Sequence, residues 1–339
     1  MSRKKKNKTS ILIPILLLFL GFIIFILGMV SGIWLTRVYD EKYNKRQVEQ
    51  QGNELVEGSE QVMEDIEPAQ TEIVTQAPTP TPEIPFNAYE AQVINWNPEW
   101  EYANYSILHT DSVTLYKSLH EGRKVIAINA GHGTSGGNSV RTQCHPDGTP
   151  KVTGGSTKKG ALDAAAVSSG TTMLDGTREG VVNLKLAMIV KEKLLNEGFS
   201  VLMIRETDDV QIDNIARTVF ANQNADCHIA LHYDSSDYDK GFFYIGVPDV
   251  ESYRNMEPVA SHWQEHNALG ESLLAGMRAK EVKIYSNGNV PLDLTQTSYS
   301  TVPSIDVEVG DRGSDYSDAA LNKLADGIVE GVKIYFADK

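Results

Sequence analysis

The 339-residue sequence predicts an α/β fold in which helices cover both faces of a mostly parallel, twisted sheet. Three observations lead to this prediction. Apolar strand segments alternate with amphipathic helix segments from residue 124 to the C-terminus. A long uncharged segment lies near the N-terminus, and an acidic, Pro/Thr-rich segment separates it from the alternating region. We therefore expect a single C-terminal domain behind a transmembrane helix and a disordered linker.

The expected elements of the domain follow from the period of their apolar residues. In chain order they are a strand at 125–129 (VIAIN), a helix at 181–197, a strand at 200–205 (SVLMIR), a helix at 213–224, a strand at 228–232 (HIALH), a strand at 242–247, a helix at 258–280, a strand at 304–309 and a helix at 318–336. Gly198 follows the first helix at the position where glycine commonly ends one. Parallel neighbours joined through helices require right-handed crossovers.

The N-terminal region predicts a membrane anchor. Residues 1–10 are basic, and residues 11–35 carry no charge and are long enough to span a bilayer. A cleavable signal core has only about 7–15 apolar residues, so we expect the anchor to be retained. The basic tail favours a cytoplasmic N-terminus, which makes this a single-pass protein of the cell membrane with its domain outside. Basic residues also follow the span, so the charge bias is not one-sided: they are Arg37, Lys42, Lys45 and Arg46.

Residues 36–90 predict an extracellular linker. Residues 47–90 carry ten Asp or Glu and no Lys or Arg, and they end in alternating Pro and Thr. Such a composition cannot bury enough apolar surface to offset its ordering entropy. The linker would span roughly 40 Å on average and about 150 Å when fully stretched. Residues 91–123, with Trp96 and Trp100, are expected to pack on the domain as the chain reaches it.

The charge of the chain excludes nucleic acid as an expected partner, and its cysteine content excludes no class of protein. The net charge is −14, and the C-terminal region has no basic stripe, so nucleic acid is not an expected partner. Cys227 directly precedes a predicted strand and is expected to be a buried thiol. A disulfide with Cys144 stays open, because the predicted location is oxidising.

Two histidines and a glutamate predict a metal site. His132 and His232 each close an apolar strand segment, and Glu179 lies just ahead of a helix. The carboxyl ends of parallel strands and the following helix starts gather at one edge of an α/β sheet. Two imidazoles and a carboxylate at that edge are the ligands of a catalytic zinc with an open fourth position. Glycines on both sides of His132 let its backbone turn sharply.

Other histidines fit this site less well. His228 lies about 13 Å of strand rise from His232, so only His232 can join a site at the edge, and His228 is expected to be structural. His262 and His266 are four residues apart on a predicted helix. Trp263, however, stands where the helical zinc-protease signature requires Glu. We expect these two to lie on the helix surface.

A hydrolytic zinc site also needs a general base. In the predicted strand at 304–309, Asp306 and Glu308 alternate with apolar residues and therefore share one face. Glu308 is nearer the carboxyl end, where the metal is expected, and is the better candidate for the base. Asp306 is the second candidate. The alternative is a structural carboxylate held by a helix N-terminus or by Arg217.

Five segments carry a family resemblance. They are VIAINAGHG, REGVVNLKLAMIVKEKLLNEGFSVLMIRETD, IARTVFANQNADCHIALHYDSS, GFFYIG and PSIDVEVGD. In this order they resemble the motifs of zinc-dependent N-acetylmuramoyl-L-alanine amidases of the class 3 type. The resemblance covers roughly residues 124–336 and identifies residues 124–339 as a zinc amidase domain. It implies one catalytic Zn²⁺ held by His132, Glu179 and His232, with Glu308 as the catalytic carboxylate.

The resemblance also implies the substrate. Such enzymes cleave the amide between N-acetylmuramic acid and the first L-alanine of the peptidoglycan stem peptide. The expected partners are therefore peptidoglycan, the membrane through residues 11–35, and an unidentified regulatory protein. Two alternatives stay open: a wall-binding relative that has lost turnover, and a zinc peptidase that cuts within the stem peptide.

Two features depart from the family pattern. Residues 133–178 form a much longer connection than is common, rich in Gly, Ser and Thr, which would line the substrate groove or lie over the metal as a lid. After Gly310 the family usually continues with Phe and a small polar pair, whereas here Asp311, Arg312 and Gly313 follow. The second departure affects substrate detail more than the chemistry.

Overall fold

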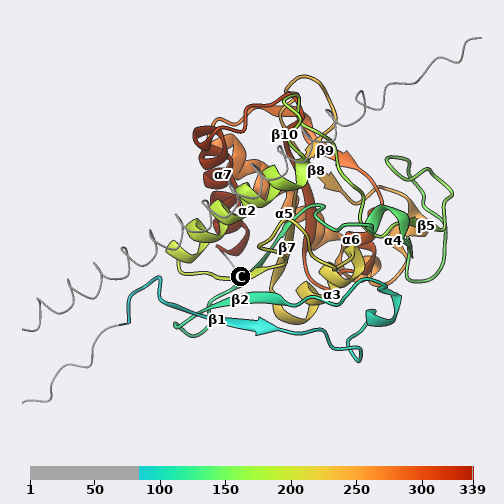
Figure 1. Ribbon diagram of the computed structural model, residues 1–339, viewed down its shortest axis with the longest axis horizontal. Coiled ribbons are helices and arrows are strands. Elements are labelled where there is room, and N and C mark those ends of the chain that lie inside the picture. The colour runs from blue at the N-terminus through green and yellow to red at the C-terminus, as the bar shows by residue number, and fades with distance from the viewer. Residues whose placement is uncertain (1–83, 338) are drawn as a thin grey trace, which may run out of the picture. The chain divides into compact units, whose positions relative to one another are not determined.

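The computed structural model describes residues 84–337 and 339 of the chain (Figure 1). The predicted basic tail, the predicted anchor at 11–35 and residues 36–83 of the predicted linker lie outside the described residues. Within the described part, no helix is long and apolar enough to cross a membrane.

One eight-stranded sheet forms the centre of the domain, with the strand order β1-β2-β6-β3-β7-β10-β8-β9. Its strands are β1 (Tyr89–Ile94), β2 (Val113–Ser118), β3 (Val125–Ala130), β6 (Ser200–Met203), β7 (Cys227–Asp234), β8 (Phe242–Gly246), β9 (Ile284–Pro291) and β10 (Ser304–Asp311). The strands β6, β3, β7 and β10 run parallel to their neighbours in this block. The pairs β1–β2, β2–β6 and β10–β8 are antiparallel, and β8–β9 is parallel. The prediction of a mostly parallel sheet is confirmed.

Helices connect the strands and cover the sheet. The helices are α2 (Glu179–Asn196), α3 (Asn214–Asn224), α4 (Glu251–Arg254), α5 (Val259–Ala279), α6 (Thr295–Tyr299) and α7 (Asp318–Phe336), with 3-10 turns at Ala103–Tyr105 and Gly137–Ser139. Asp213 starts α3 by accepting a hydrogen bond from Ala216 N–H, and Ser317 starts α7 in the same way through Ala320 N–H. Every helix and strand expected from the sequence is present, with ends that differ by a few residues at most.

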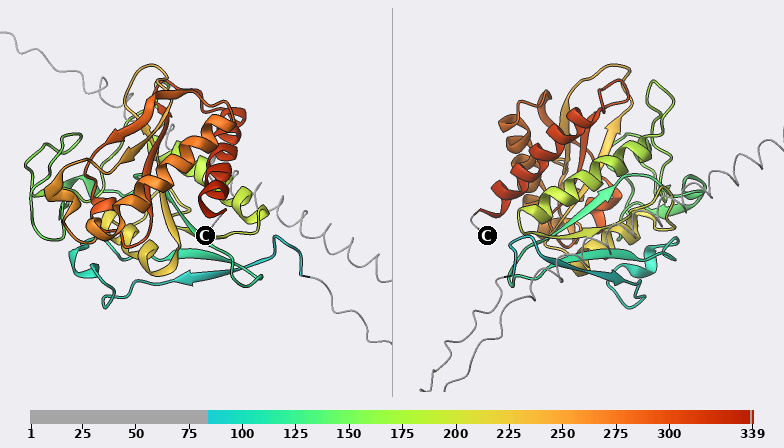
Figure 2. Two further views of the ribbon diagram at one scale, coloured as in Figure 1. Left: turned by 180° about the vertical axis from the view of Figure 1, so that it is seen from behind. Right: turned by 60° about the vertical axis from the view of Figure 1, so that its left-hand side comes forward.

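The two faces of the sheet are covered by different helices. On one face, α2, α5 and α7 pack against one another and against β3, β7, β8 and β10 (Figure 2). Ile229, Leu231 and Val307 point into this layer and are fully buried. On the other face, α3 covers the parallel strands, and its Phe220 packs on Leu202 of β6. Helices therefore lie on both faces, as predicted.

The sequence did not predict the strands at either edge. Residues 91–123 do more than pack on the domain: they supply β2 and most of β1, whose first residues, Tyr89 and Glu90, fall at the end of the predicted linker. In the segment that joins these strands, Trp96 and Trp100 contact Phe220 edge-to-face at centroid distances of 5.4 and 5.5 Å. At the other edge, β9 contains Gly288 and shows no apolar alternation, which explains why no strand was expected there.

Candidate metal centre

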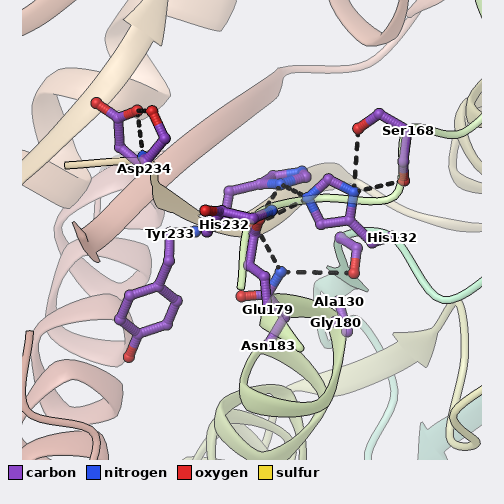
Figure 3. A network of polar contacts seen from close by, with 12 residues as sticks. Ala130, His132, Ser168, Glu179, Gly180, Asn183, His232, Tyr233 and Asp234 are labelled. Atoms are coloured by element: carbon purple, nitrogen blue, oxygen red, sulfur yellow. Dashed lines mark hydrogen bonds and ion pairs between the residues drawn. The ribbon is translucent and has the colours of Figure 1, made fainter. Parts of the chain in front are cut away.

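Three side chains from three segments converge at the carboxyl edge of the sheet (Figure 3). His132 follows β3, Glu179 begins α2 and His232 lies in β7. Their facing atoms form a small triangle: His132 Nε2 is 2.8 Å from Glu179 Oε1, His232 Nδ1 is 3.1 Å from His132 Nε2, and His232 Nδ1 is 3.2 Å from Glu179 Oε1. The structure thus brings the three predicted residues together.

The triangle has the size that a zinc ion requires. Tetrahedral ligands bound at about 2.0–2.1 Å lie roughly 3.3 Å apart, close to the three observed distances. Two nitrogens and one carboxylate oxygen are ligands typical of catalytic zinc. Among the described residues, this is the one group of three or more metal-ligating side chains close enough to share an ion. The donor set and its spacing therefore fit zinc.

The backbone of His132 aims the imidazole into the triangle. His132 has φ 64° and Gly133 has φ 74°, a left-handed conformation that a histidine seldom adopts. The carbonyl oxygen of Ser168 lies 2.8 Å from His132 Nδ1 and accepts its proton. Nε2 is the nitrogen that faces Glu179 and is left for a metal ion. Burial lowers the pKa of His132, which favours this neutral, metal-binding form.

Two buried arginines hold the turn that carries His132. Arg217 donates to the carbonyl oxygens of Ala130 and His132 at 3.1 and 2.6 Å. Arg205 donates to the carbonyl oxygens of Ala130 and Gly131 at 2.8 and 2.9 Å. Arg217 therefore serves the backbone of the site, and its hydrogen bonds go to carbonyl, amide and hydroxyl oxygens rather than to the Asp306 or Glu308 carboxylate.

Glu179 is held in place as an ionised carboxylate. Its Oε1 accepts from Asn183 Nδ2 and from Tyr233 N–H, both at 3.1 Å, and its Oε2 accepts from Thr171 N–H at 2.7 Å. Burial by itself would raise the pKa of Glu179, but hydrogen bonds from His132 and His232 hold it far below its usual range. The glutamate is thus charged and oriented before any metal binds.

The ring of His232 lies close against the backbone of Gly131. A Cβ atom at Gly131 would stand 2.5 Å from His232 Nε2 and 2.6 Å from Nδ1, so only glycine leaves room for the imidazole. Burial opposes the charged form of His232, but the hydrogen bond to Glu179 outweighs it and raises the pKa to about 9. His232 therefore holds a proton that a metal ion would displace.

The two carboxylates of β10 lie beside this triangle. Glu308 pairs in register with His232 on the neighbouring parallel strand, and Asp306 pairs with Ala230, so both share the face of His232. Burial is the main reason why the pKa of Glu308 rises to about 8 and that of Asp306 to about 6. One oxygen of each, Glu308 Oε2 and Asp306 Oδ1, is buried without a hydrogen-bond partner. Glu308 has the position and the unfilled acceptor expected of a base.

The remaining histidines are structural. His228 is fully buried, and its Nδ1 lies 3.2 Å from Ser304 Oγ, as expected of a core residue. His266 is also fully buried and accepts a hydrogen bond from Ser304 N–H at 2.9 Å. The expectation that His266 lies on the helix surface is therefore wrong. Its acceptor role ties α5 to the start of β10.

The long connection at 133–178 contacts the ligands directly. Beyond its short hairpin of β4 (Arg141–Gln143) and β5 (Asp163–Ala165), it reaches His132 through Ser168 and Glu179 through Thr171. Gly170 has φ 75°, and a Cβ there would lie 2.6 Å from His132 Cδ2 and 2.7 Å from Glu179 Oε2. This segment therefore forms one wall of the site.

Sequence analysis did not identify the residues that orient the ligands. Asn183 follows Glu179 by four residues, a spacing that puts both on one side of a helix and that could have revealed the contact. Ser168 contacts His132 Nδ1 through its main-chain oxygen at 2.8 Å and its hydroxyl at 3.2 Å, and a serine in a loop gives no signal of either contact. Arg205 carried only the signal of a charged residue at the end of an apolar strand.

Comparison with known proteins assigns the domain. The model of the N-acetylmuramoyl-L-alanine amidase family, Amidase_3, matches residues 126–333. The chain belongs to this family. The three residues of the triangle and both carboxylates of β10 lie within the matched region of the amidase.

One solved structure, that of Ami1 from Mycobacterium smegmatis, shares the fold. The amidase is similar to the N-acetylmuramyl-L-alanine amidase Ami1 from Mycobacterium smegmatis, with 17% identity and a TM-score of 0.53 over 64% of this chain and 98% of that one. Ami1 from Mycobacterium abscessus has 20% identity and a TM-score of 0.49, over 63% of this chain and 98% of that one. An N-acetylmuramoyl-L-alanine amidase from Clostridium difficile 630 has 18% identity and a TM-score of 0.47, over 65% and 100%. No relative was found among the curated proteins.

The cysteines take no part in the site. Cys144 and Cys227 are both buried free thiols, so no disulfide joins them. Cys227 lies in β7 within the apolar layer beneath α2, α5 and α7, as expected.

Proposed function

We propose that this amidase hydrolyses the bond between N-acetylmuramic acid and L-alanine in peptidoglycan, with a zinc ion held by His132, Glu179 and His232. The observation that carries the proposal is the preformed triangle of ligand atoms with Glu308 in register beside it. When bound, zinc acidifies a coordinated water to a pKa of roughly 7 and polarises a carbonyl.

The chain's own residues supply the proton transfers and the orientation. Glu308 takes the proton of the attacking water on a carboxylate oxygen and returns it to the leaving amine of L-alanine. Burial raises the pKa of Glu308, which gives its carboxylate a higher affinity for this proton. Ser168 and Asn183 keep His132 and Glu179 oriented throughout.

The test uses purified peptidoglycan and counts new amino termini. Wild-type protein loaded with zinc should release new L-alanine amino termini. Glu308→Gln should bind zinc and lose at least about 1,000-fold in kcat, and His232→Ala should lose the metal itself. New termini at a later residue of the stem peptide would identify a peptidase, and wall binding without new termini would identify a binding module. An active Glu308→Gln variant would contradict the role of Glu308.

The proposed location rests on the sequence. Residues 11–35 anchor the chain in the cell membrane, with residues 1–10 in the cytoplasm and the amidase domain outside, within reach of the wall through an acidic linker. Cysteines placed at residue 2 and in the linker should differ in labelling by a membrane-impermeant reagent in intact cells. Labelling at residue 2 would reverse the topology, and recovery of the chain in the soluble fraction would refute the anchor.

A further inference from the structure

One contact near the site is not used by the proposed reaction. The Nε2 atom of His232 faces away from the triangle, toward Asp306 Oδ2 at 3.9 Å. His232 Nδ1 is committed to Glu179 and His132. If Nδ1 binds the metal, Nε2 must carry the ring proton, and a ligand imidazole is commonly held by an acceptor for that proton.

Asp306 has the surroundings of such an acceptor. Its side chain is 16% exposed, and its Oδ1 is buried without a hydrogen-bond partner. Its cross-strand neighbours are Ala230 on β7 and Ile245 on β8, whose side chains offer no donor. A buried carboxylate is costly unless it is paired or hydrogen-bonded, and His232 is the ionisable partner within reach.

We infer that Asp306 is a positioning residue that accepts the Nε2 proton of His232 and so fixes this ring for metal binding through Nδ1. This inference rests on the proposed function, because it assigns Asp306 a role toward the same zinc. A shift of about 1 Å shortens the contact to the length of a charge-assisted hydrogen bond. The close approach of Gly131 to the ring limits how far His232 can move.

The inference separates the two carboxylates of β10 by role. Glu308 lies one strand repeat closer to the carboxyl end, in register with His232, and takes part in proton transfer. Asp306 lies one repeat deeper and acts only through His232. The sequence offered both carboxylates as candidates for the base. Their different depths in the sheet give them different roles.

The experiment measures zinc affinity without reference to turnover. Zinc dissociation constants of full-length wild type, Asp306→Asn and Asp306→Leu are determined by competition with a chromogenic chelator. Asp306→Leu removes the acceptor while keeping the same branched side-chain skeleton, and should weaken zinc binding by about 10–100-fold. Asp306→Asn keeps a neutral acceptor and should fall between Leu and wild type. Asp306→Glu should restore part of the affinity.

A matched control and a spectroscopic readout make the test specific. Glu308→Gln lies on the same face of the same strand, carries the same charge change and should bind zinc within about 3-fold of wild type. In zinc-loaded protein labelled with ¹⁵N-histidine, the His232 Nε2 proton should move upfield in Asp306→Leu, a change that mere cavity filling does not produce. Unchanged affinity in both Asp306→Leu and Asp306→Asn would overturn the inference, and if the Leu variant does not fold, the Asn variant alone decides.

The outcomes for the two proposals are separable. If wild type releases no L-alanine termini while Asp306 variants lose zinc, the proposed reaction fails and the positioning role stands. If wild type cleaves and the Asp306 variants keep full zinc affinity, only the positioning role fails.

Discussion

Two sets of buried carboxylates in this domain have opposite surroundings. Asp293, between β9 and α6, is 1% exposed and accepts hydrogen bonds from the connection at 133–178. Its donors are His145 Nε2 at 3.1 Å, Lys151 Nζ at 2.9 Å, Val152 N–H at 2.6 Å, Thr153 N–H at 3.1 Å and the Thr153 hydroxyl. Asp306 and Glu308, on β10, each keep a buried oxygen with no partner.

The pKa directions follow this difference. Burial would raise the pKa of Asp293, but its many donors hold it well below the usual range. For Asp306 and Glu308 burial dominates and raises the pKa. A buried carboxylate whose acceptors are filled serves the fold, whereas one whose acceptors are open is available for chemistry. Asp293 ties residues 145–153 of the long connection to the loop between β9 and α6.

The largest expected effect on stability is at Asp293, the carboxylate whose oxygens all accept hydrogen bonds. Asp293→Ala should lower the free energy of unfolding by about 3–5 kcal/mol, because Lys151 is left as a buried, unpaired charge. Urea denaturation of zinc-free protein measures it. Asp163→Ala, an exposed carboxylate in the same connection, is the matched control and should stay within about 0.5 kcal/mol. A loss below about 1 kcal/mol for Asp293→Ala would show that the connection is not anchored there.

The next effect separates the metal site from the connection. Gly131→Ala places a methyl group against the His232 ring and should weaken zinc binding by about 100-fold, or 2.7 kcal/mol. Gly154→Ala is the control, since a Cβ at Gly154 meets no atom within 4 Å. Chelator competition gives both affinities. Equal zinc affinity in the two variants would mean that His232, whose ring lies against Gly131, is not a zinc ligand.

A third effect extends the comparison from buried acids to a buried base. Burial lowers the pKa of His266 to about 3, below the value of 6.5 of an unperturbed histidine. Below pH 6.5 the unfolded chain binds a proton at His266 that the folded protein does not bind. The contribution of neutral His266 to the free energy of unfolding is therefore fully present above pH 6.5 and is lost as the pH falls toward 3. His266→Asn keeps an acceptor for Ser304 N–H and removes the titration.

The measurement is the difference in unfolding free energy between wild type and His266→Asn as a function of pH. Wild type should lose about 2 kcal/mol relative to the variant between pH 6.5 and pH 5, at about 1.4 kcal/mol per pH unit. A difference that does not change over this window would show that His266 titrates normally in the fold.

Most of the sheet and the site could be predicted from periodicity. The strands β3 and β7 are mostly apolar, because central parallel strands are buried on both faces, and their ends predicted where His132 and His232 would meet. In β10 the alternation of carboxylates with apolar residues predicted the strand and the face of Asp306 and Glu308. Glu179 could be added because a helix start belongs to the same edge. The triangle in the structure follows from these local signals alone.

What could not be predicted depends on contacts between distant segments. The strands β1 and β2 lie at a sheet edge, where one face is open to solvent and the apolar signal is weak. Asp293 reads as an ordinary loop residue, and its donors lie about 140 positions earlier in the chain. Ser168 reaches His132 through a carbonyl group that every residue has and through a hydroxyl that is common in loops. Such contacts have no local pattern, so only the fold reveals them.

The smallest expected effect completes the comparison of the two sets of carboxylates. Glu308→Gln should raise the free energy of unfolding of the zinc-free protein by about 1 kcal/mol, because a charge buried without a partner is removed while a polar group of the same size stays buried. The pKa of Glu308 is raised to about 8, so the gain should be absent near pH 4.5 and grow as the pH rises toward 8. Thermal unfolding at pH 5 and pH 8 tests it, with Asp293→Asn expected to shift stability the opposite way. A Glu308→Gln variant less stable than wild type at pH 8 would mean that the Glu308 carboxylate, like that of Asp293, stabilises the fold. It would then not be a group that lowers stability in exchange for catalysis.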